Sequence, residues 1–513
     1  MKKICSICKK SFLGIFIVIY GIAFLIDLFF EGWEYCCKKS VLIPNLFFVI
    51  IIIGLLILGK KIYIKREVIE SKLQKSDRWI LIFTGVLFVI QVLITYCIIF
   101  RTSWDAGIVT AQARLVAQKS SEVWAEYYSS HPNNLFITFI YSFFYWIAGI
   151  FGNDSFGVIL IAIVQCLMSS IAAMLVYKIM RKICKGRILP VSSWCVFALW
   201  IGMSPWKIIP YSDSFGLFFP IVILWLYQLL QNNRFVIVKC MLIGAITILG
   251  FKIKPTVMIL LIAIVIIELI KLLEKEKRKE AVLRIGVLCL SAIVTIIAYG
   301  CFDMAGYMKI EINEEAACGP THFLMLGLRE DTNGVYSSGD EEFSKSFDTK
   351  EERSKANIEE VKRRIQEFGF SGLVRHGVKK SLTNFNDGTF TWGWDGDFYA
   401  GIIDEPEPIL SPILRSFYYD DGKFNFLFVA IMQFWWIFIL FGMILNVFDL
   451  INKREIADIK SVIMLALIGM AIFVMIFEGR ARYLYLYSPI YVIISFFGFQ
   501  AFFVSGETNK NGN

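Results

Sequence analysis

Residues 79–100 read WILIFTGVLFVIQVLITYCIIF, a stretch of 22 residues without a charged side chain. A helix of about 20 mostly apolar residues can cross the hydrocarbon core of a bilayer. The segment before it, 60–78, is basic, and basic loops stay on the cytoplasmic side of a membrane. The stretch therefore predicts a transmembrane helix that starts in the cytoplasm and ends outside, just before Asp105.

The whole chain has the composition that this stretch suggests. Of its 513 residues 57% are hydrophobic, 46 are Phe and 19% are charged, and the mean hydropathy is +0.63. Soluble proteins carry about 25% charged residues, and a soluble chain this apolar could not cover its core with polar surface. The composition excludes a soluble enzyme, a disordered protein, a collagen and a disulfide scaffold. It predicts an all-α polytopic membrane protein.

Twelve apolar runs are long enough to be transmembrane helices. They lie at residues 11–30, 41–63, 79–100, 155–177, 189–205, 211–230, 236–252, 255–273, 285–303, 425–448, 459–477 and 483–504. A thirteenth run, 135–151, would leave the basic loop 178–187 outside if it crossed the membrane. We therefore expect 135–151 to lie along the outer face as a juxtamembrane helix, with both chain termini in the cytoplasm.

This topology divides the chain into four regions. They are two extra N-terminal helices with a cytoplasmic loop (1–78), a transmembrane core with a catalytic outer loop at 101–154 (79–303), an extracytoplasmic domain (304–424) and C-terminal transmembrane helices (425–513). The extracytoplasmic region has a net charge of −8 and the remainder +17, so the overall +9 follows membrane topology and does not indicate nucleic acid. Thr349 and Glu352 form a capping box and Gly369 ends the helix that follows, so this region is expected to be mostly helical.

Polar residues next to the apolar runs carry the functional information, because a bilayer strongly disfavours them. Four such motifs fall on the outer face. They are Ser103-Trp104-Asp105-Ala106-Gly107, Tyr128-Ser129-Ser130-His131-Pro132-Asn133-Asn134, Pro210-Tyr211-Ser212-Asp213-Ser214 and Glu478-Gly479-Arg480-Ala481-Arg482-Tyr483. Lys254 lies in a further outer turn.

These residue types suggest a transfer reaction at a lipid phosphate. A carboxylate such as Asp105 can accept the proton of an attacking hydroxyl, and Lys or Arg can neutralise a phosphate leaving group. The sequence has no Walker loop and no G-x-G-x-x-G before a strand, and the outer face has no ready supply of nucleotide sugars. A sugar carried on a membrane lipid phosphate needs no nucleotide-binding motif and is available at the outer face. We therefore expect glycosyl transfer from a polyprenyl-phosphate sugar to an acceptor glycan, lipid or protein.

Five motifs, in this order, resemble the GT-C superfamily of integral membrane glycosyltransferases, on the side of the protein O-mannosyltransferases and aminoarabinose transferases. They are an acidic motif after an outward helix (Asp105), a juxtamembrane helix with His131-Pro132, an outer turn with Tyr211-Ser212-Asp213, a Lys254-Pro255 pair and an Arg482-Tyr483 pair that enters the last helix. The resemblance covers residues 79–260 and 478–490. Two features depart from the family: Ala106 stands where many members have Glu, and two helices precede the usual first one.

The resemblance implies that Asp105 is the catalytic base and that Lys254 and Arg482 contact the lipid phosphate. The other candidates are polar or aromatic residues of the same motifs and of the acidic extracytoplasmic region, 304–424. They are His131, Tyr211, Asp213 and Arg480 for substrate binding, and Trp392 and Trp394 as possible sugar or acceptor contacts. No metal-ligand set is predicted, a divalent cation at the acidic outer site stays open, and no nucleic acid partner is expected.

Each candidate also has a structural alternative. Asp105 could cap helix 106–118, and His131 could cap the helix that begins with Pro132. Asp213 could be a solvated turn residue. The cations Lys252, Lys254, Arg480 and Arg482 could be interface anchors, and Trp392 and Trp394 could belong to a core or a membrane belt.

Two other function classes fit a chain with many apolar helices. A polymerase or ligase of lipid-linked glycans would place its key arginines in the large outer loop, whereas the best ones here are Arg480 and Arg482. A transporter or flippase would place ionisable groups at mid-bilayer and often contains internal repeats, and the sequence shows no repeat.

The predicted sidedness can be tested by cysteine labelling in intact cells. A Ser338→Cys variant is expected to react with a membrane-impermeant thiol reagent, and a Lys277→Cys variant is not, because the charge asymmetry of the loops puts them on opposite sides. The unsubstituted protein gives the background. Labelling at 277 with protection at 338 would put the acidic region in the cytoplasm.

Overall fold

The computed structural model describes residues 2–30, 42–120, 122–153, 156–231, 234–394, 398–402, 408–453 and 455–505. Within these ranges the chain is almost entirely helical, so the predicted fold class is confirmed. A single two-residue antiparallel ladder among the described residues joins β1 (Phe100–Arg101) to β2 (Gly401–Ile402).

The helices of the first 303 residues are α1 (Lys2–Phe29), α3 (Leu42–Ile64), α4 (Arg66–Lys72), α5 (Ser76–Ile98), α6 (Asp105–Ala117), α7 (Ala125–Ser130), η1 (Pro132–Asn134), α8 (Leu135–Ile150), α9 (Phe156–Ile183), α10 (Ile188–Trp200), η2 (Pro205–Ile208), α11 (Ser212–Gly216), α12 (Phe218–Leu229), α13 (Val236–Ile253), η3 (Pro255–Val257), α14 (Met258–Lys271) and α15 (Arg278–Gly300). The remaining helices are α16 (Met304–Tyr307), η4 (Glu314–Ala316), α17 (Pro320–Gly327), α18 (Ser338–Lys345), α19 (Lys350–Phe385), α20 (Ser411–Tyr418), α21 (Asn425–Ile444), α22 (Val447–Asn452), α23 (Asp458–Ile476), α24 (Arg482–Tyr485) and α25 (Ser488–Ser505).

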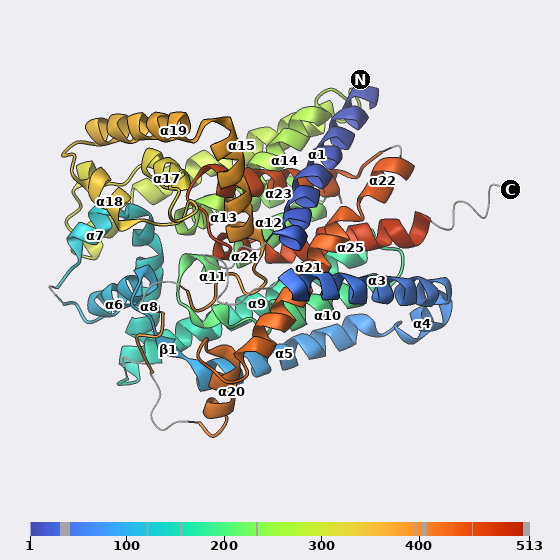
Figure 1. The fold of residues 1–513 in the computed structure, drawn as a ribbon, viewed down its shortest axis with the longest axis horizontal. Helices are drawn as coiled ribbons and strands as arrows, with labels where there is room; N and C mark the ends of the chain where they lie inside the picture. The colour runs from blue at the N-terminus through green and yellow to red at the C-terminus, as the bar shows by residue number, and fades with distance from the viewer. Residues whose placement is uncertain are drawn as a thin grey trace.

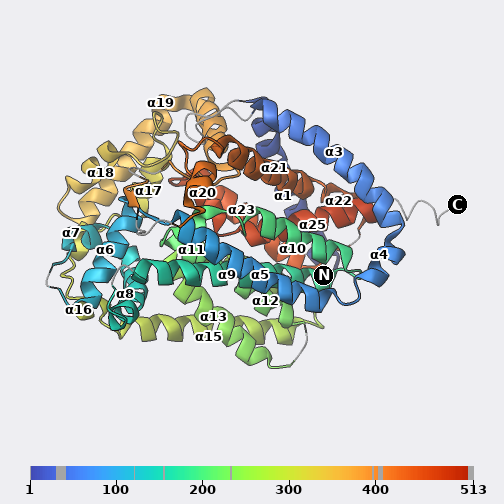
Figure 2. The same ribbon diagram turned by 90° about the horizontal axis from the view of Figure 1, so that it is seen from below.

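The long helices lie side by side in one bundle (Figures 1 and 2). Among the described residues, eleven helical segments are long and apolar enough to cross a membrane. Ten of them coincide with predicted spans, and the eleventh is Pro132–Ile150, the segment expected along the membrane surface. The predicted spans 189–205 and 255–273 contain the shorter helices α10 and α14, each next to a 3-10 turn.

Side-chain contacts between α5 and α9 show that α8 does not cross the bundle. Tyr177 Oη donates to the Asp77 carboxylate at 2.8 Å, and Thr95 Oγ1 lies 3.3 Å from Cys166 Sγ. The residue numbers of the contacts decrease along α9 as those along α5 increase, so the two helices are antiparallel. The end of α5 and the start of α9 therefore lie at the same end of the bundle, as the loop charges require.

The loops predicted to be cytoplasmic meet at the opposite end. Lys2 Nζ forms an ion pair with Glu276 at 3.1 Å, and the Glu70 carboxylate accepts a hydrogen bond from the Arg187 backbone N–H at 2.7 Å. We name this the basic end. In both ribbon views α4 lies there, whereas α6, α7 and α18 lie at the other end, which we name the site end (Figures 1 and 2).

Helices α16 to α19 form the acidic region at the site end. Thr349 caps α19 as predicted, because its Oγ1 accepts a hydrogen bond from the Glu352 backbone N–H at 3.3 Å. Gly369 has φ +54° and divides α19 into two helices, in the left-handed conformation that glycine adopts without strain. The second helix leaves the acidic region and enters the bundle, where the Phe385 ring packs edge-on against Tyr20 at 5.9 Å.

A non-helical segment, 386–394, follows Phe385 inside the bundle. Three indole N–H groups donate to backbone carbonyls in and next to it: Trp200 to Gly388 at 3.2 Å, Trp206 to Thr389 at 2.9 Å and Trp436 to Phe385. The Asp387 carboxylate accepts from the Thr389 and Thr391 backbone N–H groups at 2.7 and 2.5 Å. Irregular backbone at membrane depth is stable only where the protein supplies such partners.

The Asp387→Ala variant tests the importance of this buried turn. It removes the acceptor for two buried amide donors, so we expect the free energy of unfolding to fall by about 1–3 kcal/mol for each donor. Denaturant unfolding in detergent measures the change, with Asp348→Ala at an exposed position as the control. Equal stability of the two variants would contradict this role.

Candidate functional site

Asp105 opens α6, directly after the short strand β1. The N-cap of α6 is Trp104, and Asp105 lies in the first turn, so the alternative that Asp105 itself is the cap is wrong. An acidic side chain in the first turn still interacts favourably with the positive end of the helix dipole. The approach to the helix is tight, because a Cβ on Gly107 would lie 2.0 Å from the Thr102 carbonyl oxygen. Only glycine fits this turn.

The Asp105 carboxylate lies beside two phenols from different motifs. Tyr211 Oη donates to Asp105 Oδ2 at 3.0 Å. Burial, and then the negative charge of Asp105, raise the pKa of both Tyr211 and Tyr127 well above the usual value. Both phenols therefore stay protonated, and Tyr211 orients the carboxylate by donating to it.

A second carboxylate, Asp213, holds the two predicted phosphate-binding cations. Its side chain is 1% exposed and lies 2.7 Å from Lys254 Nζ and 3.7 Å from Arg482 Nε. Burial lowers the pKa of Lys254, with the charge of Asp213 acting in the opposite direction. Burial also acts against the charge of Arg482, but Tyr483 and Asp213 hold the pKa of Arg482 above its usual range. Asp213 is thus the buried counterion of two cations and not a solvated turn residue.

The Tyr211 ring joins the two carboxylates into one site. Lys254 Nζ lies 5.9 Å and Arg482 Cζ 5.8 Å from its centroid. Trp104 packs edge-on against the same ring at 5.0 Å, and Arg482 lies 4.6 Å above the Trp104 ring. Asp105, Lys254 and Arg482, the three residues to which the resemblance gives roles, therefore lie around one phenol.

Glu478 adds a third acid to this cluster. It is 8% exposed, and burial raises the pKa of its carboxyl while Arg482 acts in the opposite direction. Tyr483 lies under Lys254, whose Nζ is 4.2 Å from the ring centroid. Glu478 and Tyr483 lie in a motif that the sequence singled out, but their roles were not predicted.

His131 and Arg480 lie at the border of the cluster. The His131 ring stacks on Tyr127 at 5.1 Å, and although it is the N-cap residue of η1 its side chain makes no capping hydrogen bond. Arg480 is partly buried, and burial together with the charge of Arg482 lowers its pKa to about 10. Lys252, two residues before Lys254, instead lies 4.3 Å from the Tyr299 ring, outside the cluster.

Trp392 lies in a core position. It is 4% exposed, donates to the Tyr418 carbonyl at 2.8 Å and packs edge-on against Trp206 and Phe398. This placement agrees with the alternative that it belongs to a core, since no face of its ring is open to a sugar. Trp394 is partly buried, and its sugar contact stays a prediction.

Trp104 and Tyr127, like Glu478, belong to the cluster but were not predicted as site residues. Trp104 lies inside a quoted motif, and Tyr127 comes directly before another. Aromatic residues beside a membrane are common enough that neither position signalled a site. Within the described ranges, no three His, Cys, Asp or Glu side chains are arranged to hold a metal ion.

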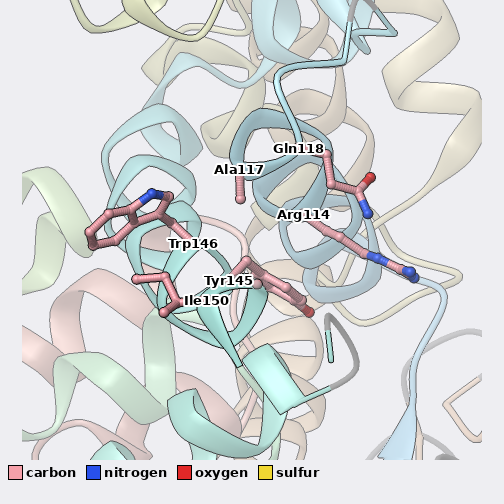
Figure 3. A pocket seen from close by; sticks show the side chains of 7 residues that line it. Arg114, Ala117, Gln118, Tyr145, Trp146 and Ile150 are labelled. Carbon is pink, nitrogen blue, oxygen red and sulfur yellow. The ribbon is translucent and has the colours of Figure 1, made fainter. Parts of the chain in front are cut away.

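A cavity of about 260 Å³ lies between α6 and α8, and Figure 3 shows most of the residues that line it. Arg114 and Gln118 extend from α6, and Tyr145, Trp146 and Ile150 extend from α8. Arg114 is nine positions after Asp105, or about 13 Å along a helix with 1.5 Å rise per residue. The cavity therefore lies at the other end of α6 from the Asp105 cluster.

Fold and site define a helical multi-pass membrane protein with a buried charged site at one end of the bundle. The profile of a family described as a conserved hypothetical integral membrane protein matches residues 1–502, and the chain belongs to that family. No curated protein and no solved structure matches the chain.

The ion cluster is testable by a double-mutant cycle on Asp213 and Lys254. Asp213→Asn leaves two buried cations without their counterion, so we expect it to cost about 3–5 kcal/mol of unfolding free energy. Lys254→Met should also be costly, and the double variant should lose less than the sum of the two. Denaturant unfolding in detergent gives all three values. Strict additivity would show that the two side chains do not interact.

Proposed function

We propose that the protein transfers a sugar from a polyprenyl-phosphate donor to an acceptor hydroxyl on the extracytoplasmic side of the membrane. The observation that carries this proposal is the meeting of one carboxylate, Asp105, with two buried cations, Lys254 and Arg482, around a single phenol. A base and a phosphate-binding pair are the two elements that such a transfer needs.

The chemistry divides between the two halves of the cluster. Asp105 accepts the proton of the acceptor hydroxyl while the oxygen of that hydroxyl forms a bond to C1 of the sugar. The bond between C1 and the phosphate oxygen breaks, and the polyprenyl phosphate leaves with the electron pair. Lys254 and Arg482 stabilise the negative charge that develops on that oxygen, and Tyr211 keeps the Asp105 carboxylate in position by donating to it.

The half of the cluster that holds Lys254 and Arg482 favours an anionic ligand. Lys254 and Arg482 carry two positive charges against the single charge of Asp213, which holds them in place. Burial raises the pKa of Glu478, which limits how much negative charge it adds. Asp105, as the ionised base, balances the remaining positive charge, so a phosphate is attracted to the Lys254 and Arg482 half of the cluster, where burial strengthens such interactions.

The charged loops indicate the side of the membrane on which the reaction occurs. The loops of the basic end carry the excess of Lys and Arg that marks the cytoplasmic side, so the site end faces out. A lipid carrier is the sugar donor suited to that side. This orientation is the one that the cysteine-labelling experiment tests.

Two arginines of the acidic region, Arg353 and Arg364, have structural roles, which favours transfer over the polymerase or ligase alternative. Arg353 donates to backbone carbonyls, including that of Ser344 at 2.8 Å, and Arg364 pairs with Asp340 at 2.7 Å. These large-loop arginines therefore have structural partners, whereas Arg482 lies beside the predicted base.

The Asp105→Asn variant tests the base. The amide keeps the shape of the side chain but cannot accept the proton, so transfer should fall by about 100-fold or more. The assay follows release of polyprenyl phosphate from a panel of synthetic polyprenyl-phosphate hexoses and pentoses, with purified protein in nanodiscs and a cell-envelope extract as acceptor. Asp348→Asn, at an exposed position, is the control, and unfolding in detergent checks stability. Full activity of Asp105→Asn would remove the proposed base.

The Arg482→Lys variant tests the phosphate contact. Lysine keeps the charge but loses the planar fork that binds two phosphate oxygens, so the KM for the donor should rise about tenfold with a smaller change in kcat. Arg278→Lys, at the basic end, should leave both constants unchanged. A fall in kcat at constant KM would assign Arg482 to another role.

A further inference from the structure

A second cavity at the site end, a groove of about 660 Å³, lies between the chain that follows α17 and the middle of α19. One wall is segment 328–333, and the other is the part of α19 between residues 363 and 379. Figures 1 and 2 place α17, α18 and α19 next to one another at this end. The groove is separate from the Asp105 cluster and is lined mainly by polar side chains.

Ion pairs link much of this lining. Arg329 pairs with Asp331 at 2.5 Å and with Asp340 at 3.0 Å, and Arg363 pairs with Glu360 at 2.5 Å and also with Glu367. Such pairs present planar donors and acceptors in set directions. Hydroxyl groups of a sugar chain are ligands of matching chemistry, since each can both donate and accept a hydrogen bond.

Two cations add a net positive charge to the α19 wall. Arg375 and Lys379 are four residues apart and line the groove on the same face of the helix, with Ser371 one turn before them. Within the described part of the chain neither forms an ion pair. An anionic group in the groove would therefore meet two cations that form no ion pair with a described carboxylate, although Glu330 and Glu367 line the same groove.

The other wall connects the groove to the candidate active site. The Gly334 carbonyl accepts a hydrogen bond from the Gly479 N–H at 3.1 Å, and Lys380 Nζ bridges the carbonyls of Gly327 and Phe477 at 2.8 and 2.6 Å. Segment 327–334 is thereby fixed to the loop that leads into Arg480 and Arg482.

The same wall continues toward the base. Two residues beyond Gly334, Tyr336 donates to Glu341 at 2.5 Å and lies within electrostatic reach of Asp105. Tyr336 is also 49% exposed, so its ring is accessible at the surface. One continuous segment of ten residues thus runs from the end of α17, along the groove, to the neighbourhood of the carboxylate.

We propose that this groove binds the acceptor, and that the acceptor is an anionic glycan, a polyhydroxylated chain that carries carboxylate or phosphate groups. The proposal rests on the proposed function, since it names the substrate that accepts the sugar. The ion-paired lining orients the hydroxyls, Arg375 and Lys379 bind the anionic groups, and segment 328–336 directs the chain end to Asp105.

A matched pair of hexasaccharides tests the ligand class. The hexamer of oligogalacturonate and its fully methyl-esterified form have the same length, sugar and linkage and differ in the negative charge of the carboxylate at C6. We expect the purified protein in nanodiscs to bind oligogalacturonate at least about tenfold more tightly, by isothermal titration calorimetry, and this preference to weaken with added salt.

Variants of α19 test the site. Arg375→Gln/Lys379→Gln should weaken oligogalacturonate binding about tenfold or more, whereas Lys355→Gln/Lys362→Gln removes the same charge from the same helix outside the groove and should leave binding unchanged. Ser371→Glu, which adds a negative charge to the wall, should also weaken binding. Absence of binding, equal affinity for both hexasaccharides, or equal effects of the two double variants would overturn the proposal.

Direct binding separates this proposal from the proposed function. Asp105→Asn should bind oligogalacturonate like the unsubstituted protein, because Asp105 does not line the groove. If the groove variants no longer bind oligogalacturonate but still catalyse Asp105-dependent transfer, the groove is not the acceptor site, and the proposed transfer reaction still holds. If the protein binds oligogalacturonate in the groove but catalyses no transfer, the proposed transfer reaction is wrong.

Discussion

The buried carboxylate of Asp213 is the constraint on which the arrangement of the site depends. An ionised group that is 1% exposed needs positive charge within contact distance, and two cations from distant parts of the chain supply it. Lys254 follows α13 and Arg482 begins α24, while Asp213 lies in α11, and α11 contacts both helices. The chain segments that carry Lys254, Asp213 and Arg482 must therefore meet. Tyr211 is then placed between the cation pair and Asp105, which brings the proposed base and the proposed phosphate contacts around one ring.

A second constraint fixes the acidic region to the bundle. Segment 386–394 is irregular backbone among apolar helices, so its carbonyl and amide groups need partners from the protein. Indole N–H groups, the Asp387 carboxylate and the side-chain amide of Gln433 provide them. Phe390 and Thr391 adopt φ of +59° and +64°, a left-handed conformation that costs energy in residues other than glycine and persists only where the surroundings enforce it. As a result, the acidic region, with its groove and Tyr336, keeps its position relative to Asp105.

The sequence alone predicted the features that depend on local pattern. Apolar runs located ten of the long helices, loop charges placed 135–151 on one side of the bundle, and Thr349 and Gly369 marked a helix start and a helix break. The partners of Asp213 could not be predicted, because the contact joins residues 41 and 269 positions apart and a bare charge at a membrane edge is compatible with solvation. The position of Trp392 could not be predicted either, since an aromatic side chain suits a sugar site, a membrane belt and a core equally well. The proposed family resemblance brought Asp105, Lys254 and Arg482 together only as an expectation, and Trp104, Tyr127 and Glu478 emerge from the packing.

The most direct measurement of the central claim is a cryo-electron microscopy structure of the protein in nanodiscs with a bound polyprenyl phosphate. We expect density for the phosphate within hydrogen-bond distance of Lys254 and Arg482, with the Asp105 carboxylate at the hydroxyl end of the Tyr211 ring. The lipid chain should leave the site toward the membrane. A phosphate bound away from both cations, for example beside Arg114 in the cavity between α6 and α8, would contradict the account.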